Sequence, residues 1–313
     1  MKVPRPLTRR DAVRLMTVAA VSSCLPVLPI GIAAGNSRWN PRYALASSLF
    51  GEEPLEAILA VVKTTGAEAI DLWPRKHGSQ REQVDEMGAE TFAGLLGKYG
   101  VRLGLTTRFD LGPFRLTDEM KFVSDFGGKL IVTGPQGPKG QTGDNLKKAI
   151  GTFHEQLKPH IEQAEKHGVV IAIENHSGML LDSPDAIRYF ADGIRSPSLG
   201  IAFAPYHLPQ EPALLADLIR HCGAKLALFY VWQHGKGCMA AQPKEDELQQ
   251  LPGRGPLDFR PLLTALSEVK FDGYTEIFMH PFPRGIPIVE NVQQSAVEIR
   301  KAKDHLDKCL VDL

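Results

Sequence analysis

The side chains best suited to chemistry stand at or just after the ends of apolar segments. The segment at residues 169–178, V-V-I-A-I-E-N-H-S-G, runs through five apolar residues into Glu174 and His176. Three later segments end in similar groups: His207, then Trp232 with His234, and finally Glu276 with His280 and Arg284. Carboxylates and imidazoles around one opening suit Mn²⁺, Mg²⁺, Co²⁺ or Zn²⁺. Two such carboxylates could also remove and return a proton beside a sugar carbonyl, while a metal stabilises the enediolate oxygens.

Short apolar segments alternate with longer amphipathic ones from Arg42 to the C-terminus and predict the framework that carries these groups. An apolar run without alternation is typical of a strand buried on both faces. The expected strands are residues 43–47, 68–73, 101–106, 129–133, 169–174, 199–203, 226–232 and 274–278. A helical pattern follows each strand, including single patterns over residues 83–99 and 144–167. Eight such pairs predict one α/β domain, a (β/α)8 TIM barrel over residues 42–313, whose polar strand ends share one face.

The N-terminal segment, residues 1–34, has the composition of an export signal. A twin-arginine pair at residues 9–10 precedes an uncharged apolar stretch over residues 15–34, which ends in small residues. Two prolines interrupt the stretch, which favours a removed signal over a membrane anchor. The tetrapeptide V-S-S-C also resembles a lipoprotein box, with Cys24 as the lipid-bearing end. We therefore expect export to the periplasm or cell envelope of a bacterium, with membrane contact only through the signal or a lipid on Cys24.

Without that segment the chain is acidic. The sequence holds 36 basic and 36 acidic residues, of which residues 1–34 contribute five and one, leaving 31 basic against 35 acidic. This balance gives no reason to expect nucleic acid as a partner. Glycine recurs at every third position over residues 134–143, where a flexible loop over the barrel mouth is a better explanation than a phosphate cradle. No nucleotide cofactor is therefore expected, and the oligomeric state is left open.

Four motifs carry a resemblance to a known family. They are I-A-I-E-N-H-S-G, L-G-I-A-F-A-P-Y-H-L, P-G-R-G-P-L-D-F and F-D-G-Y-T-E-I, in this order along the chain. Their order and spacing resemble the xylose isomerase-like TIM barrel family, which holds sugar and sugar phosphate isomerases and epimerases and the endonuclease IV branch. The resemblance implies a small-molecule carbohydrate as the partner. It also implies a divalent metal at the C-terminal mouth, held by two glutamates, an aspartate and a histidine.

Carried over onto this sequence, the family's metal site is incomplete. Glu174 matches the glutamate of strand five. The family's aspartate stands three residues before His207, and Ala204 takes its place here, with a methyl group that cannot ligate a metal. The glutamate of strand eight would fall at Phe278.

Other polar groups stand near the missing ligands. The family's histidine on strand seven has no clear counterpart: Tyr230 or Trp232 occupies its place, with His234 displaced into the loop. On strand eight, Glu276 would lie one layer deeper in the barrel than the family's glutamate, and His280 one layer higher.

These comparisons assign expected roles. We expect Glu174 and Glu276 to act as an acid/base pair. Substrate contact is expected from His207, Trp73, His77, His176, Trp232 and Arg284. A divalent metal, if bound, is expected on Glu174, Glu276, His207, His234 and His280. Each group also has a structural alternative: a histidine can bond loop backbone, an aromatic ring can be packing, and Glu276 can pair with Arg108 or Arg102.

Three functions are consistent with these residues. The first is an exported sugar or sugar phosphate isomerase or epimerase that moves a proton through an enediolate. The second is a metal-free or altered carbohydrate-binding barrel without isomerase activity, because Ala204 removes a ligand. The third is an endonuclease IV-like phosphodiesterase, which the acidic charge of the chain disfavours.

Overall fold

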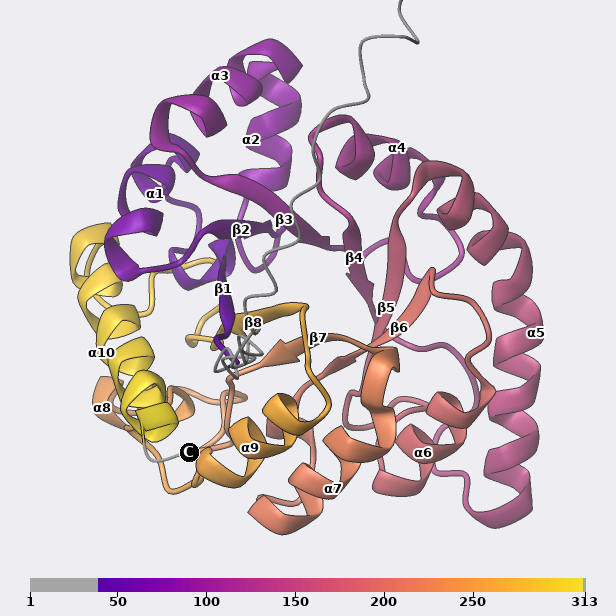
Figure 1. The fold of residues 1–313 in the computed structure, drawn as a ribbon. Coiled ribbons are helices and arrows are strands. Elements are labelled where there is room, and N and C mark those ends of the chain that lie inside the picture. The colour runs from indigo at the N-terminus through magenta and orange to yellow at the C-terminus, as the bar shows by residue number, and fades with distance from the viewer. Residues whose placement is uncertain (1–38, 312–313) are drawn as a thin grey trace, which may run out of the picture. The chain divides into compact units, whose positions relative to one another are not determined.

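The computed structural model describes residues 39–311, so the predicted export signal and Cys24 lie outside the described residues. Eight parallel strands form a closed barrel in chain order, with helices around it (Figure 1). The strands are β1 (Arg42–Ala46), β2 (Ala69–Leu72), β3 (Arg102–Thr107), β4 (Leu130–Thr133), β5 (Val170–Glu174), β6 (Leu199–Phe203), β7 (Leu226–Tyr230) and β8 (Tyr274–Ile277). The (β/α)8 barrel predicted from the sequence is confirmed.

Helices follow the strands and cover the outside of the barrel (Figure 1). They are α1 (Leu55–Val62), α2 (Gln80–Met87), α3 (Ala89–Tyr99), α4 (Thr117–Asp125), α5 (Gly143–His167), α6 (Pro184–Gly193), α7 (Pro212–Cys222), α8 (Lys244–Glu247), α9 (Arg260–Glu268) and α10 (Val292–Val311). Single 3-10 turns are η2 (Ser47–Leu49), η3 (Lys63–Thr65), η4 (Pro205–His207), η5 (Gly223–Lys225) and η6 (Leu248–Gln250). Within residues 39–311, no helix combines the length and apolar character needed to cross a bilayer.

The helix predicted over residues 83–99 is in fact two helices. Between α2 and α3, Gly88 has φ 81° and ψ 160°. This backbone conformation lies outside the helical region, and its positive φ favours glycine. By contrast, α5 is one continuous helix, as predicted. Its apolar side chains at helical spacing, including Leu146, Ile150 and Phe153, are buried.

The strand register places four polar side chains inside the C-terminal half of the barrel. Glu174 ends β5, and Tyr230 at the end of β7 pairs with Glu276 of β8. Asp71 of β2 pairs with Ala46 at the end of β1. Asp71, Tyr230 and Glu276 are fully buried, and Glu174 is almost so. Charged groups at these positions are costly unless protons, a metal or hydrogen bonds compensate them.

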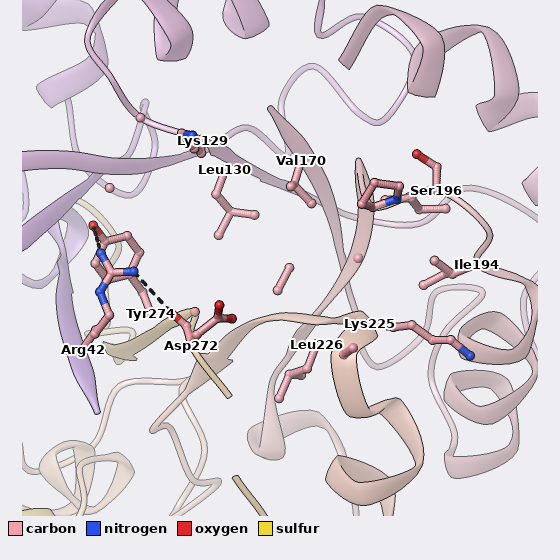
Figure 2. A pocket seen from close by; sticks show the side chains of 18 of the residues that line it. Arg42, Lys129, Leu130, Val170, Ile194, Ser196, Lys225, Leu226, Asp272 and Tyr274 are labelled. Atoms are coloured by element: carbon pink, nitrogen blue, oxygen red, sulfur yellow. Dashed lines mark hydrogen bonds between the residues drawn. The ribbon is translucent and has the colours of Figure 1, made fainter. Parts of the chain in front are cut away.

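The opposite end of the barrel, where the strands begin, holds a cavity of about 780 Å³ (Figure 2). Val170, the first residue of β5, lines this cavity, whereas Glu174 is the last residue of the same strand. The cavity and Glu174 therefore lie at opposite ends of the barrel.

Candidate functional site

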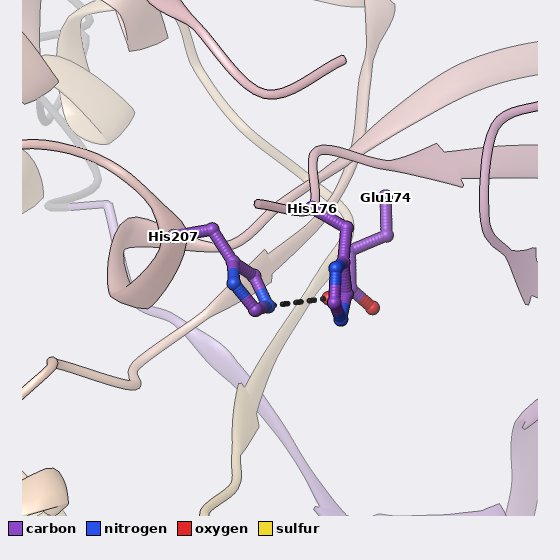
Figure 3. A group of neighbouring side chains, drawn as sticks. All are labelled: Glu174, His176 and His207. Atoms are coloured by element: carbon purple, nitrogen blue, oxygen red, sulfur yellow. Dashed lines mark ion pairs between the residues drawn. The ribbon is translucent and has the colours of Figure 1, made fainter. Parts of the chain in front are cut away.

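A carboxylate and two imidazoles meet at the C-terminal ends of β5 and β6. Glu174 ends β5, His176 follows two residues later, and His207 ends the turn η4 that comes directly after β6. One ligand atom from each of the three lies within 4.8 Å of the others. The His207 ring points at the Glu174 carboxylate, with Nε2 3.4 Å from Oε1 (Figure 3). The structure thus brings together three residues predicted separately from the sequence.

Hydrogen bonds between Ser177 and the two rings orient both imidazoles. Nδ1 of His176 lies 3.0 Å from the carbonyl oxygen of Ser177. Because a carbonyl can only accept, this nitrogen carries the proton and leaves Nε2 of His176 with a free lone pair. Nδ1 of His207 lies 3.0 Å from the Ser177 hydroxyl, which leaves its Nε2 turned towards Glu174. Such partners fix the ring orientation that metal-binding histidines need.

Asn175 holds the ends of β5 and β6 together. Its Nδ2 donates to the carbonyl oxygen of Ala204 at 2.9 Å, and the Ala204 amide donates to its Oδ1 at 2.8 Å. The Asn175 side chain is completely buried. Since Ala204 opens the turn that carries His207, these two bonds set the position of His207 relative to Glu174.

Replacing Asn175 with alanine is expected to lower the free energy of unfolding by about 2 kcal/mol, because the buried Ala204 amide loses its partner and the Ala204 carbonyl oxygen keeps only the bond from the His207 amide. Urea denaturation measures the change. Asn145→Ala, an exposed site on α5, is the matched control. A loss no larger than that of the control would mean that these bonds do not stabilise the fold.

Burial controls the protonation of the cluster. Burial raises the pKa of Glu174 to about 7. The nearby His176 ring and Tyr230 hydroxyl lower this pKa, but by less than burial raises it. The Tyr230 hydroxyl itself makes no hydrogen bond of good geometry within residues 39–311. The same cause lowers the pKa of His207 to about 3 and also lowers that of His176. At neutral pH both imidazoles are therefore neutral, which is the form that binds metals.

Deeper in the barrel lies a pair of buried carboxyl groups, Asp71 and Glu276. Thr107 Oγ1 donates to Asp71 Oδ2 at 2.7 Å, but Asp71 Oδ1 and both Glu276 oxygens have no hydrogen-bond partner among residues 39–311. Burial raises the pKa of Asp71 to about 7. Burial, followed by the nearby Asp71 charge, raises the pKa of Glu276 well above its usual range. Glu276 therefore keeps its proton to a higher pH than an exposed glutamate does.

The structure gives no support to an ion pair between Glu276 and an arginine. Arg108 pairs instead with Asp110 and Glu119. Arg102 lies 3.9 Å from Glu68, near the start of the barrel. Glu276 also lies outside the cluster of Glu174 and the two histidines.

Aromatic rings occupy the mouth of the barrel where the family resemblance implied metal ligands. Phe278 stacks on Trp73 with ring centroids 5.1 Å apart, and the edge of Trp232 meets Phe278 at 4.6 Å. Tyr206 stacks on Trp232 at 3.9 Å, and the His207 ring meets Trp232 edge-on at 5.1 Å. These rings are almost fully buried and hold His207 in place.

Two other predicted site residues, His77 and His280, form a separate imidazole pair. Their ring centroids lie 4.5 Å apart, and both rings contact Trp73. Burial lowers the pKa of His77 to about 4 and that of His280 well below its usual range. Nδ1 of each ring has no hydrogen-bond partner within the described chain. The pair is therefore neutral and lies beside the aromatic rings rather than with Glu174.

His234 and Arg284 are engaged with loop backbone. Nδ1 of the exposed His234 lies 3.3 Å from the carbonyl oxygen of Gly235. The Arg284 guanidinium donates to the carbonyl oxygens of Cys238 at 2.9 Å and Pro281 at 2.5 Å. The structure does not bring either residue into the cluster around Glu174.

Sequence reasoning missed several residues that build the site. Asp71, Thr107, Asn175 and Ser177 were not singled out as site residues, although Asp71 is the one charged residue inside its strand. A single carboxylate in a fully buried strand was the available signal for Asp71. Thr107, Asn175 and Ser177 act through bonds to other segments, for which local sequence offers no signal.

Comparison with known proteins agrees with this architecture. A model of the xylose isomerase-like TIM barrel family matches residues 59–308, and the chain belongs to that family. Among solved structures, it is similar to the IOLI protein with a binding zinc atom, at 15% identity and a TM-score of 0.67, covering 85% of this chain and 98% of that one.

Sugar epimerases are also similar in structure. A D-tagatose 3-epimerase-like protein shares 18% identity with a TM-score of 0.62, covering 86% of this chain and 97% of that one. The D-psicose 3-epimerase of Clostridium cellulolyticum, solved with D-tagatose, shares 12% identity with a TM-score of 0.63, covering 86% and 99%. At these identities the similarity shows a shared fold.

Proposed function

We propose that this protein isomerises or epimerises a carbohydrate through an enediolate, with Glu174 as the group that takes the proton. The observation that carries the proposal is a buried carboxyl group with its pKa raised to about 7, beside two neutral imidazoles. A general base works best when its pKa lies near the working pH. Similar structures named as 3-epimerases support a ketose as the substrate.

The three clustered side chains fit a divalent metal. Catalytic sites for zinc commonly use three oxygen and nitrogen ligands and leave one position open. Glu174 offers an oxygen, and His176 and His207 each offer an Nε2; that of His207 is buried without a hydrogen bond. A divalent ion bound there would polarise the sugar carbonyl and stabilise the enediolate oxygens. The zinc atom in the similar IOLI protein supports the same reading.

Two carboxyl groups of the chain are proposed to transfer the protons. Oε1 of Glu174 faces His207, so Oε2 is the atom proposed to hold the substrate proton. The raised pKa of Glu276 favours its protonated form, and Glu276 is proposed as the donor of the acid/base pair.

Carbohydrate binding without isomerisation is a second candidate function. Ala204 and Phe278 stand where the family resemblance implied an aspartate and a glutamate, and the Phe278 ring is packed against Trp73 and Trp232. Neither position can ligate a metal. A metal-dependent isomerase in this chain would therefore use the altered ligand set of Glu174, His176 and His207.

Metal binding tests the proposed ligand set. The purified chain is expected to hold one divalent ion, measured by elemental analysis and by titration with Zn²⁺ and Mn²⁺. His207→Ala should weaken binding by at least about 100-fold, because a direct ligand matters more than an outer-shell partner. His167→Ala, at the end of α5 and outside the cluster, is the matched control and should bind normally.

The same preparations separate the two candidate functions. Exchange of solvent deuterium into D-tagatose or D-psicose, followed by NMR, would support isomerisation. A chain that binds the sugar, holds no metal and catalyses no exchange would contradict the first proposal and favour the second.

The cellular location of the protein is inferred from its N-terminal sequence alone. We infer export to the periplasm or cell envelope, because residues 1–34 combine a twin-arginine pair with an apolar stretch. Cell fractionation, together with replacement of both arginines by lysine, tests this. Export that persists unchanged in that variant would contradict the twin-arginine route.

A further inference from the structure

The cavity at the N-terminal end of the barrel is built like a ligand site. Its volume of about 780 Å³ lies within the range of roughly 300–1,000 Å³ typical of small-molecule pockets. First residues of several strands line it, among them Arg42 of β1, Leu130 of β4 and Leu226 of β7. It shares no lining residue with the cluster around Glu174.

Glycines line this end of the barrel and let neighbouring strands approach closely. Gly104, Gly200 and Gly273 line the cavity and contribute only backbone. A Cβ atom on Gly200 would lie 2.6 Å from that of Ala227, and one on Gly104 would lie 2.9 Å from that of Ala69. Larger side chains at these positions would force the strands to shift. Barrel interiors are normally filled by bulky branched side chains, so the open space is a departure from the usual packing.

Basic side chains surround the opening. The lining holds five basic residues and one acidic residue: Arg42, Arg102, Lys129, Arg195 and Lys225, against Asp272. This excess is local, because residues 35–313 contain 31 basic against 35 acidic residues. A concave surface lined by one sign of charge concentrates ions of the opposite sign.

Several of these cations have no carboxylate partner. Within residues 39–311, Lys129 and Lys225 form no ion pair, and Arg195 donates only to the carbonyl oxygens of Asp192 and Ile194. Arg42 is different, because it pairs with Glu68 and bonds the Tyr274 hydroxyl. The unpaired ammonium groups are thus available to an anion.

Apolar side chains form the walls between these charges. Leu130, Val170 and Leu226 project into the space between the strands, with Arg42, Lys129 and Lys225 around it (Figure 2). Leu103 and Leu199 complete the apolar lining. An inorganic anion alone would leave these walls without contacts, and a neutral molecule would leave the cations unpaired.

We propose that this cavity binds an organic anion with an apolar body and a carboxylate, sulfonate or phosphate head. The head lies beside one of the unpaired ammonium groups, that of Lys129 or that of Lys225, and the body contacts the leucine and valine side chains. This second site is independent of the reaction proposed at Glu174.

A pair of fluorescent probes tests the proposal on the full-length chain. Anilinonaphthalene sulfonate carries an apolar ring system with a sulfonate, and phenylnaphthylamine has the same rings without the charge. The double variant Lys129→Glu/Lys225→Glu is expected to weaken binding of the sulfonate about tenfold or more and to leave binding of the neutral probe within twofold. Either probe can also bind at other sites on the chain. Such binding is the same in the native chain and the variants, so it cancels when their affinities are compared.

The matched control carries the same change of charge away from the cavity. Lys139 and Lys148, near the start of α5, are exposed, form no ion pair within the described residues and do not line the cavity. Lys139→Glu/Lys148→Glu should bind the sulfonate as the native chain does. Equal loss in both double variants, or no loss in either, would overturn the proposal. Stoichiometric metal binding at Glu174 should persist in all of them, which separates this result from the proposed function.

Discussion

Replacing Glu174 with glutamine is expected to lower kcat for proton transfer by roughly 10²- to 10⁴-fold, the usual contribution of a general base. Glutamine keeps the size of the side chain but cannot accept the proton. The buried position beside His207 is retained, so KM for the sugar should change much less than kcat. Deuterium exchange from solvent into the substrate measures the chemical step directly.

The control for this prediction is Glu162→Gln, an exposed glutamate on α5 that should leave the rate unchanged. In the native chain without metal, deprotonation of Glu174 should raise the rate of exchange around pH 7, since burial raises its pKa to about 7. A glutamine variant that retains more than about a tenth of the native rate would show that another group takes the proton.

Replacing Asp71 with asparagine is expected to stabilise the fold at alkaline pH and to change little in acid. Burial raises the pKa of Asp71 from 3.8 to about 7, so the folded protein binds more protons than the unfolded chain between about pH 4 and pH 7. The stability that protonated Asp71 contributes is present below pH 4 and is lost as pH rises through 7. A shift of about three pKa units corresponds to roughly 4 kcal/mol at most.

Asparagine removes this loss, because it carries no charge at any pH and still accepts the bond from Thr107. Urea denaturation at pH 4 and at pH 8 should show the two proteins diverging only at the higher value. The buried histidines also respond to pH, but they are common to both proteins and cancel in the difference. Asp144→Asn, at a fully exposed site, should show no such divergence from the native protein. If the Asp71 and Asp144 variants showed the same pH dependence of unfolding, a raised pKa at Asp71 would be contradicted.

The barrel itself was predictable because its pattern is local. Each buried strand is a short apolar run, and each covering helix repeats its apolar residues at helical spacing, so eight repeats define the fold. The error at Gly88 has the same origin. Apolar spacing continued across residues 83–99, and only the backbone conformation of one glycine separates α2 from α3.

The partners of Glu174 were less predictable. His176 was expected to contact the substrate. The structure places it beside the Glu174 carboxylate, where it is a candidate metal ligand. His234 and His280 were expected to ligate the metal, and the structure places them against loop backbone and against His77. Their roles as ligands remain predictions without geometric support. Loop paths decide which imidazole reaches which strand end, and these paths depend on packing between distant segments.

From the sequence alone, the barrel and the position of Glu174 at the end of β5 were determined, and the family resemblance added that Ala204 and Phe278 stand where metal ligands are implied. These features follow from residue types and their order along the chain. Only the tertiary structure decided that His176 and His207 meet Glu174, that Asp71 and Glu276 share the barrel interior, and that cations surround a cavity at the other end. The physical reason is that burial and contact through space set the charge of each group, and both depend on side chains supplied by other strands.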